Sequence, residues 1–485
     1  MINFRLIYKA LGSLLLLETI FLLCCLGVSF FYYEDDILAF ALSVMVALMG
    51  SVVLRFLGRG ADNALSRRDA YLLVTLTWIM FSLFGALPFV VSGYVTNPTD
   101  AFFETMSGFT TTGASVIDRV ERLPHGLLFW RSMTQWVGGL GIVFFTIALI
   151  PSMTGGTVRV FAAEATGPMH VRMHPRLGTT AKWIWSIYVA LTVACGALFY
   201  LEGMNGFDCV NYAMTITATG GFATHSEATG FYHDALIDYT AVAFMFLSGI
   251  SFAMLYALLF KGQIKRFFGN SELKLYGGLT LVITTIIGFF LLQFGGYSAA
   301  DSLKNALFQT VSFLTTTGLF NDDVGQWPHA IWVMLCFCMF AGGCSGSTSG
   351  GFKCIRLVMV LKILQNELKH ILHPKAVLPV KINGTSIAYG QQMTLMAFFS
   401  AYFLLVMITH FAMIVSGIDT VNAFTIAMSC ASNVGPALSL NIGPAISWAD
   451  IPNVSKWLLS CLMLMGRLEI FSVVVLFTPS FWKDN

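Results

Sequence analysis

Apolar residues form long uninterrupted stretches along this chain, and most charged residues lie in the segments between them. A helix of about 20 predominantly apolar residues is long enough to cross a bilayer core. The pattern therefore predicts ten membrane-spanning helices: Leu11–Phe31, Ile37–Phe56, Ala70–Val91, Leu127–Ile150, Trp183–Leu201, Tyr239–Phe260, Leu275–Phe294, Ile331–Leu364, Gln391–Val415 and Trp457–Phe477. Arg5 and Lys9 precede the first stretch as in a signal peptide, but no small-residue cleavage site precedes Tyr32, so we expect a retained helix.

The placement of basic residues predicts which side of the membrane each linker faces. An even number of spans puts both termini on one side. Lysine and arginine are enriched in cytoplasmic loops. Alternate linkers carry most of them: Arg55, Arg59, Arg67, Arg68, Arg159, Arg172, Arg176, Lys182, Lys261, Lys265, Arg266, Lys274, Lys362, Lys369, Lys375 and Lys381. The opposite segments are mainly acidic, as at Glu34, Asp35 and Asp36, so we expect cytoplasmic termini.

The composition supports a membrane protein and excludes several other classes. Hydrophobic residues make up 56% of the 485 residues, charged residues make up 11%, and the mean hydropathy is +0.76. A soluble protein needs more polar surface than this. The net charge of +2 does not suggest a nucleic-acid partner, and the ten cysteines form no C-x-x-C pairs with nearby histidines, so we expect no zinc site.

A repeated unit follows the first two spans. The remaining eight spans form four pairs, and each pair encloses an outward segment with a short apolar stretch and a glycine-containing turn. Stretches of about 10–14 apolar residues are too short to cross, which is typical of re-entrant half-helices. Ala101–Gly113 reads AFFETMSGFTTTG and Ala306–Gly318 reads ALFQTVSFLTTTG, with eight of thirteen positions identical. The copies Asp208–Gly220 and Ala423–Gly435 are weaker. We predict units 1–69, 70–180, 181–273, 274–385 and 386–485.

The four turns are candidates for an ion-selectivity filter. The predicted filter residues are Thr111, Thr112, Gly113, Ala218, Thr219, Gly220, Thr316, Thr317, Gly318, Asn433, Val434 and Gly435. Irregular backbone survives at membrane depth where it lines a water-filled path or is buried in protein. Four such loops around one axis would present carbonyl oxygens that replace the hydration shell of a cation. Glycine-rich turns are common, so the argument rests on their recurrence at equivalent positions.

These residues resemble the Trk/Ktr/HKT superfamily of potassium transporters, specifically its bacterial TrkH-type members. The resemblance covers essentially the whole chain: an N-terminal helix pair, four helix–pore–helix repeats and the four loops. It implies an all-α polytopic fold around a pseudo-fourfold pore in the bacterial inner membrane, with K⁺ as the transported ion and no cofactor. The T-V-G-Y-G string of tetrameric channels is absent, and Ala218 and Asn433 replace threonine. We therefore expect weaker discrimination against sodium.

The resemblance also implies partners that the residues themselves do not reveal. These are a cytosolic ring of nucleotide-binding regulatory subunits, TrkA-like, and a second copy of the chain in a homodimer. The chain carries no nucleotide-binding motif of its own. Basic linkers, particularly Lys353–Lys381, offer a docking surface for the ring.

The span Ile331–Leu364 contains AGGCSGSTSGG, which predicts a break. Each glycine in a helix interior costs about 1 kcal/mol relative to alanine. We expect an unwound, serine-containing middle formed by Gly342, Gly343, Ser345, Gly346, Ser347 and Gly350. Close packing of small residues against a neighbouring helix is the alternative. By resemblance, this segment is the family's intramembrane loop beneath the filter, which acts as a gate.

Arg467 lies deep in the last predicted span, within LMLMGRLEIFS. An intramembrane arginine costs at least about 2.5 kcal/mol unless it faces water or a partner. It could form a structural pair with Glu469 or with another helix, although residues i and i+2 face apart on a helix. We favour a pore-facing role. The resemblance places an arginine there, below the filter, where its charge would raise a barrier to cations. Lys353 and Arg356 are expected to extend toward the cytoplasm.

Besides a membrane scaffold or receptor with a vestigial filter, two other functional classes need to be weighed. No P-loop, H-E-x-x-H or complete G-x-S-x-G constellation occurs, so we do not expect an enzyme. An alternating-access symporter, coupled to H⁺ or Na⁺, would place its site between inverted repeats. The four repeats here share one orientation, which favours a fixed pore, but coupling stays open at this point.

Overall fold

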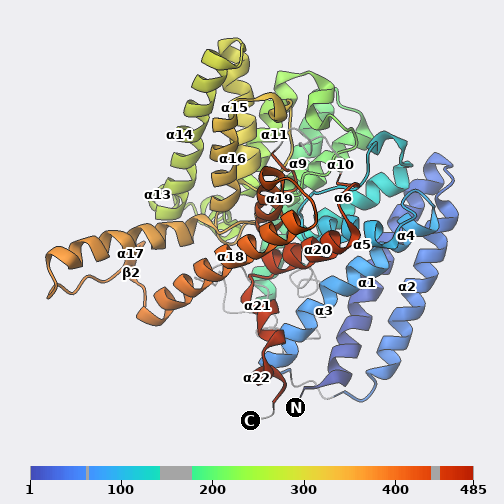
Figure 1. The fold of residues 1–485 in the computed structure, drawn as a ribbon. Helices are drawn as coiled ribbons and strands as arrows, with labels where there is room; N and C mark the ends of the chain where they lie inside the picture. The colour runs from blue at the N-terminus through green and yellow to red at the C-terminus, as the bar shows by residue number, and fades with distance from the viewer. Residues whose placement is uncertain (1, 62–64, 142–176, 439–447, 484–485) are drawn as a thin grey trace.

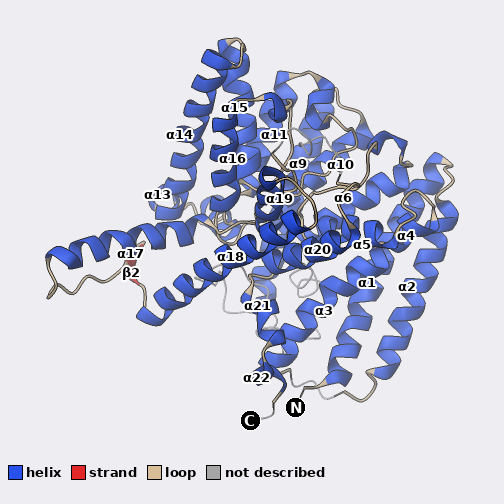
Figure 2. Cartoon of the chain, in the orientation of Figure 1, coloured by secondary structure: helices blue, strands red, loops and turns tan. Residues whose placement is uncertain are grey.

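The computed structural model describes residues 2–61, 65–141, 177–438 and 448–483, and Figures 1 and 2 show how the elements lie. Within these ranges the chain is helical apart from one small antiparallel pair, β1 (Lys381–Ile382) and β2 (Thr385–Ser386). Six helices are long and apolar enough to cross a membrane, or up to eight if each of two bent pairs counts as one span. The protein is an all-α multi-pass membrane protein.

Two N-terminal helices, α1 (Phe4–Tyr32) and α2 (Ile37–Leu57), form a hairpin that packs through α1 on the first repeat. Gly12 permits close approach, because Ser51 Oγ donates to its carbonyl oxygen at 2.6 Å. The two ends of the chain lie near the start of α3, where Asn3 N–H donates to Asp69 and Arg68 donates to the carbonyl oxygen of Lys483. Both ends therefore lie on one side of the bundle, as an even number of spans predicts.

The rest of the chain forms four repeats of a long helix, a short helix and a second helix. They are α3 and α4 (Arg67–Gly85, Leu87–Val91), α5 (Pro98–Phe109), α6 (His125–Gly139); α9 (Leu177–Leu201), α10 (Gly206–Ala218), α11 and α12 (Ala235–Ser248, Phe252–Leu259); α14 (Ser271–Phe294), α15 (Ala299–Leu314), α16 and α17 (His329–Ala341, Cys354–Leu372); and α18 (Tyr389–Val415), α19 (Thr420–Ser432), α20 and α21 (Asn453–Arg467, Phe471–Val474). Short connecting elements are α13 (Ile264–Gly269), α22 (Pro479–Trp482) and the 3-10 turns η1 (Val120–Arg122), η3 (Ala228–Tyr232), η4 (Val324–Gln326) and η5 (Val475–Phe477).

Contacts between repeats close a ring. The second helix of each repeat packs on the short helix of the next: α6 on α10, α11 on α15, α16 on α19 and α20 on α5. The last of these pairs joins the fourth repeat to the first. The pseudo-fourfold arrangement predicted from the repeated sequence is therefore present.

The four short helices begin at side-chain caps. Asn97, Asn205, Ser298 and Asp419 each accept a hydrogen bond from a backbone N–H in the first turn of their helix. Such caps satisfy donors that have no partner within the helix. The helices contain 12, 13, 16 and 13 residues, too short to span a bilayer, as predicted.

The second helices of repeats 2, 3 and 4 are broken at the same stage. The predicted break in Ile331–Leu364 is confirmed, because α16 ends at Ala341 and α17 begins at Cys354. The continuous spans predicted for Tyr239–Phe260 and Trp457–Phe477 are wrong: they bend by 99° and 113°. Residues 142–150 of the predicted span Leu127–Ile150 lie outside the described residues.

Two different backbone features produce the unpredicted bends. After α11 the carbonyl oxygen of Gly249 accepts a hydrogen bond from Cys344 N–H at 2.9 Å, so the loop of repeat 3 replaces a helical partner. After α20, Glu469 and Ile470 have φ of 58° and 42°, which no helix allows. Neither site contains proline, so the apolar pattern gave no warning.

Candidate functional site

Each short helix ends in the same backbone turn. Thr111, Thr219, Thr316 and Asn433 have φ between 54° and 58°, in the left-handed region. The next residue of each loop donates its N–H to a carbonyl oxygen five residues back, as Thr112 does to Ser107 and Val434 does to Ser429. This pattern is the left-handed helix cap, which satisfies carbonyl groups at a helix end. A glycine with positive φ follows in every loop: Gly113, Gly221, Gly318 and Gly435.

This geometry corrects the predicted alignment of the second loop by one residue. Gly221, not Gly220, corresponds to Gly113, and Thr219 corresponds to Thr111. Ala218 is the last residue of α10, so it belongs to the pore helix. The sequence could not distinguish the two alignments, since residues 208–220 and residues 209–221 each match residues 101–113 at three positions.

The four positive-φ glycines close the loops into a ring. A β-carbon on Gly113 would lie 2.1 Å from the carbonyl oxygen of Gly220, and one on Gly221 would lie 2.0 Å from that of Thr317. The ring continues with 1.9 Å from Gly318 to Val434 oxygen, and it closes with 2.4 Å from Gly435 to Thr112 oxygen. Each glycine leaves room for a carbonyl of the next loop, so all four loops meet at one place.

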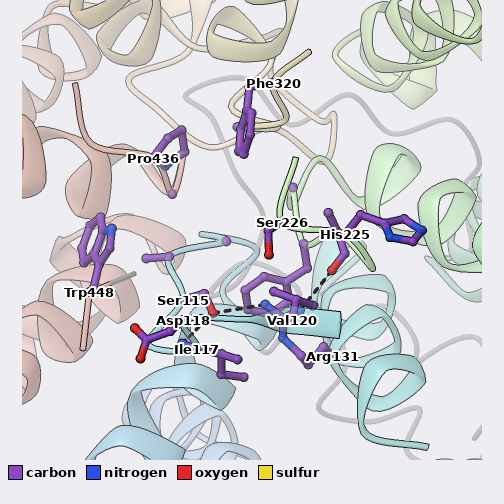
Figure 3. Close-up of a pocket in the computed structure, with 17 residues that line it drawn as sticks. Ser115, Ile117, Asp118, Val120, Arg131, His225, Ser226, Phe320, Pro436 and Trp448 are labelled. Atoms are coloured by element: carbon purple, nitrogen blue, oxygen red, sulfur yellow. Dashed lines mark hydrogen bonds between the residues drawn. The ribbon is translucent and has the colours of Figure 1, made fainter. Parts of the chain in front are cut away.

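A pocket opens on one side of this ring, and Figure 3 shows its lining. All four positive-φ glycines line it, together with side chains from every repeat. Ser115, Asp118 and Arg131 come from the first repeat, and His225 comes from the second. In Figure 3, Phe320, Pro436 and Trp448 complete the wall from the third and fourth repeats. The pocket therefore leads to the ring from this side.

Asp208 holds the segment that follows the second loop, and this segment forms part of the pocket wall. Its carboxylate accepts a hydrogen bond from Thr224 Oγ1 at 2.6 Å and lies 3.1 Å from His225 Nε2. Tyr232 also donates to it. Burial alone would raise the pKa of Asp208, but the hydrogen bonds from His225, Thr224 and Tyr232 outweigh it, and the pKa is lowered. The carboxylate therefore stays ionised.

A buried ion pair braces the first loop. Arg131 Nε lies 2.9 Å from Glu104 Oε1, and both side chains are at most 3% exposed. The same carboxylate accepts from Ser115 Oγ and Val116 N–H, while the guanidinium donates to the carbonyl oxygen of Ala223. The pair thus joins the segments that follow loops one and two.

Replacing Arg131 with leucine should destabilise the folded protein by about 3–5 kcal/mol, because Glu104 would remain buried without its partner. The measurement is thermal unfolding in detergent, with exposed Arg122→Leu as the control. The double variant Arg131→Leu/Glu104→Leu should recover part of the loss. Equal unfolding temperatures for Arg131→Leu and Arg122→Leu would contradict the structural role of the pair.

Gln135 of α6 binds the backbone of the second loop. Its Nε2 donates to the carbonyl oxygen of Gly220 at 2.7 Å, and its Oε1 accepts from Phe222 N–H at 3.0 Å. The amide is fully buried on α6. One ring carbonyl is therefore engaged by the scaffold, and the second loop differs from the others.

The loop between α16 and α17 lies against the ends of three short helices. Thr348 Oγ1 donates to the carbonyl oxygen of Thr217 at 3.1 Å. Gly350 N–H donates to Thr316 Oγ1 at 2.6 Å, and Gly351 N–H donates to the carbonyl oxygen of Ser432 at 2.9 Å. The predicted broken segment therefore lies directly against the ring, on the side of the helix ends.

The predicted gate residues occupy two parts of this loop. Gly342, Gly343 and Gly350 pack tightly within it, since a β-carbon on any of them would lie at most 2.6 Å from another atom. Ser345, Gly346 and Ser347 lie at its more exposed turn. There, Ser345 N–H donates to Glu272 Oε1 at 2.5 Å, and Phe252 N–H donates to the carbonyl oxygen of Gly346.

Arg467 joins the loop to the end of α6. It donates to the carbonyl oxygen of Thr348 at 2.9 Å and to those of Gly138 and Gly139 at 2.6 Å each. Its side chain is buried at 9% exposure. Of the two structural alternatives, pairing with Glu469 is wrong, since Glu469 pairs with Arg356, whereas a partner on another helix is found in the α6 carbonyl groups.

The expectation that Lys353 and Arg356 extend toward the cytoplasm is also wrong. Both are buried, at 2% and 5% exposure. Lys353 Nζ donates to the carbonyl oxygen of Ser349, and Arg356 packs 4.0 Å over the ring of Phe398 while pairing with Glu469. Because α17 restarts beside these partners, both cations hold the loop in place.

Comparison with known proteins identifies the family. The family described as TrkH, cation transport protein, matches residues 37–484. The chain belongs to the TrkH family. TrkH-family relatives named Trk system potassium uptake protein TrkH, from Halomonas elongata and Escherichia coli K12, are each 35% identical, over 99% of this chain and 100% of theirs. The crystal structure of the potassium transporter TrkH from Vibrio parahaemolyticus superposes with a TM-score of 0.90 at 34% identity, covering 99% and 100% of the two chains.

Four residues around the site of this TrkH-family chain were missed in the sequence. Arg131 lies in a predicted span, so the cost of an intramembrane arginine that singled out Arg467 applied to it as well. Glu104 and Gln135 lie in apolar surroundings and carried the same signal. Glu272 stands at the start of a span, where a charge is ordinary, so nothing in the sequence distinguished it.

Proposed function

We propose that this chain takes up potassium across the bacterial inner membrane through a filter formed by its four loops. The observation that carries the proposal is the closed ring in which each positive-φ glycine admits a carbonyl of the next loop. The relatives are named potassium uptake proteins, which is why we propose potassium as the ion. The filter residues are Thr111, Thr112, Gly113, Thr219, Gly220, Gly221, Thr316, Thr317, Gly318, Asn433, Val434 and Gly435.

The ring suits a monovalent cation. Backbone carbonyl oxygens replace the hydration shell of the ion, and the carboxyl ends of four short helices carry partial negative charge. The bond from Gln135 occupies the carbonyl oxygen of Gly220, so the ring has fewer free oxygens than four identical loops would give. Discrimination against sodium should therefore be weaker than in a fourfold-symmetric channel.

The loop from Gly342 to Gly351 and Arg467 form the gate in this proposal. The loop lies against the helix ends of repeats 2, 3 and 4, and Arg467 connects it to α6 of the first repeat. A cation leaving the ring would meet both. The arrangement is that of a closed gate, since an ion can pass only after these contacts break.

The proposal includes the sidedness and the partners expected from the resemblance. Cytoplasmic termini follow from the basic linkers, although Arg159, Arg172 and Arg176 lie outside the described residues. The basic hairpin that ends α17 projects from the bundle in Figure 1, with Lys369 and Lys375 exposed. It would receive the cytosolic nucleotide-binding ring, and two copies of the chain would form the dimer.

The test is rubidium uptake into liposomes by wild type and by Gly113→Ser. Wild type should pass rubidium and potassium, and the substitution should cut flux or admit sodium, because a side chain would displace the Gly220 carbonyl. Uptake should persist when ionophores abolish the proton and sodium gradients. Loss of uptake without those gradients would favour the symporter, and unchanged flux and selectivity in Gly113→Ser would exclude the ring as the filter.

A further inference from the structure

The four residues at the left-handed position differ in what holds their side chains. Thr111 Oγ1 is buried and has no hydrogen-bond partner in the described part of the chain, and Thr219 Oγ1 donates to the carbonyl oxygen of Ala218 at 2.7 Å. Asn433 Nδ2 donates to Thr112 Oγ1 at 3.0 Å and to the carbonyl oxygen of Met463 at 2.9 Å. Among these four positions, only Thr316 has its side chain bound by the gate loop.

The bond to Thr316 is one of two adjacent contacts made by backbone N–H groups. Gly350 N–H reaches Thr316 Oγ1, and Gly351 N–H reaches the carbonyl oxygen of Ser432. Gly350 has to be glycine for this approach, because a β-carbon would lie 2.2 Å from the Ser432 oxygen. Two successive N–H groups that converge on oxygens form a concentration of partial positive charge. The loop therefore presents to these oxygens the same sign of charge as a cation.

We propose that Thr316 is a specificity-determining residue whose hydroxyl oxygen is shared between the gate loop and the transported cation. When the loop is seated, Gly350 N–H occupies this oxygen. When the loop leaves, the oxygen becomes a ligand for a dehydrated cation at the inner end of the filter. This inference rests on the proposed function of the four loops and deepens it, since it couples the gate to one position of the filter.

The coupling follows from competition for one acceptor. A seated loop weakens cation binding at Thr316, and by linkage a cation bound there weakens the seating of the loop to the same extent. Thr111 occupies the equivalent position, yet its oxygen has no partner from the loop. The chain therefore contains its own matched control, with the same residue, the same backbone conformation and no gate contact.

The test compares basal rubidium flux and the rubidium-to-sodium ratio in liposomes. Thr316→Val removes the acceptor at constant volume, so basal flux should rise about two- to tenfold, the range for one hydrogen bond, and the ratio should fall. Thr316→Ser keeps the oxygen, so its flux and its ratio should both lie closer to wild type than those of Thr316→Val. Thr111→Val should lower the ratio without raising the flux.

A second variant tests the coupling from the side of the loop. Gly350→Ala should displace the loop and raise basal flux, with Gly390→Ala, which has open space around it, as the control. In the Gly350→Ala background, Thr316→Val should lower the ratio but should not raise the flux again, because the contact is already lost. Folding is checked by monodisperse elution of each variant. If Thr316→Val fails to fold, flux and ratio can still be compared in Thr316→Ser with the loop seated and, after adding Gly350→Ala, with the loop displaced.

The outcomes separate this inference from the proposed function. If Thr316→Val lowers the ratio but leaves flux low, or raises flux equally with and without Gly350→Ala, the filter stands and the coupling is overturned. Equal effects of Thr316→Val and Thr111→Val on flux also overturn it. If Thr316→Val, Thr111→Val and Gly113→Ser all leave flux and ratio unaltered, the loops are not the filter and both proposals fail.

Discussion

Substituting alanine for Gly221 should reduce rubidium uptake by roughly tenfold or more. The new β-carbon would lie 2.0 Å from the carbonyl oxygen of Thr317, and the residue would have to keep a φ of +80°. The left-handed conformation alone costs about 1–2 kcal/mol for a residue with a β-carbon. The clash adds to this cost, because the β-carbon would meet a backbone atom of the third loop, and that backbone cannot move without opening the ring. Uptake per folded molecule in liposomes measures the loss.

Gly93 provides the matched control for conformational strain. It has the same φ of +80°, but no atom lies within 4 Å of its added β-carbon. Gly93→Ala should therefore retain uptake. Gly220→Ala should show a smaller loss than Gly221→Ala, since its β-carbon would meet the end of the Gln135 side chain and not a backbone atom of another loop. A larger loss for Gly220→Ala would return the alignment of the second loop to the one predicted from the sequence.

Replacing Arg467 with glutamine should raise basal uptake by roughly tenfold or more. At an effective dielectric constant of 20, a unit charge within one or two residues' width of a cation opposes it by about 1–4 kcal/mol. The substitution removes that repulsion and also removes hydrogen bonds to the carbonyl oxygens of Thr348, Gly138 and Gly139. Both changes favour the displaced loop. Rubidium flux in the absence of any partner protein is the measurement.

Two further variants show which property of Arg467 matters. Arg467→Lys keeps the charge but cannot make the same fork of hydrogen bonds, so its flux should lie between those of wild type and Arg467→Gln. Lys265→Gln removes an exposed charge on a linker and should leave flux at the wild-type level. If Arg467→Gln abolishes uptake, the arginine supports transport and does not oppose it.

The sequence predicted the architecture well because the membrane imposes a simple rule on it. Length and hydropathy located six spans that are continuous helices in the described residues. The repeat Ala101–Gly113 against Ala306–Gly318 located the short helices and their turns. The glycine run near Gly342 correctly predicted a broken helix. The bends after Ser248 and Arg467 were not predictable in this way, since they depend on partners from another repeat and on two residues in strained backbone.

The site was predicted less completely than the fold. The turns are local in sequence, so three of the four were placed correctly, while two adjacent glycines in the second left the alignment undecided. The side-chain contacts that hold the loops join residues far apart in the sequence. Gln135 contacts a loop 85 residues away, and the contact between Arg467 and Gly138 joins residues 329 apart. No pattern within a window of sequence encodes such pairs.

The closure of the ring within a single chain affects how the ion path can change during evolution. In a ring of four identical subunits, one codon changes all four sides together, so every substitution is made fourfold. Here Gly435 closes on Thr112 of the same polypeptide, and each side has its own codons. Asn433 can therefore be tied to Met463 while Thr316 is tied to Gly350. One side can specialise in holding the structure and another in contacting the loop between α16 and α17, so exact fourfold symmetry is lost.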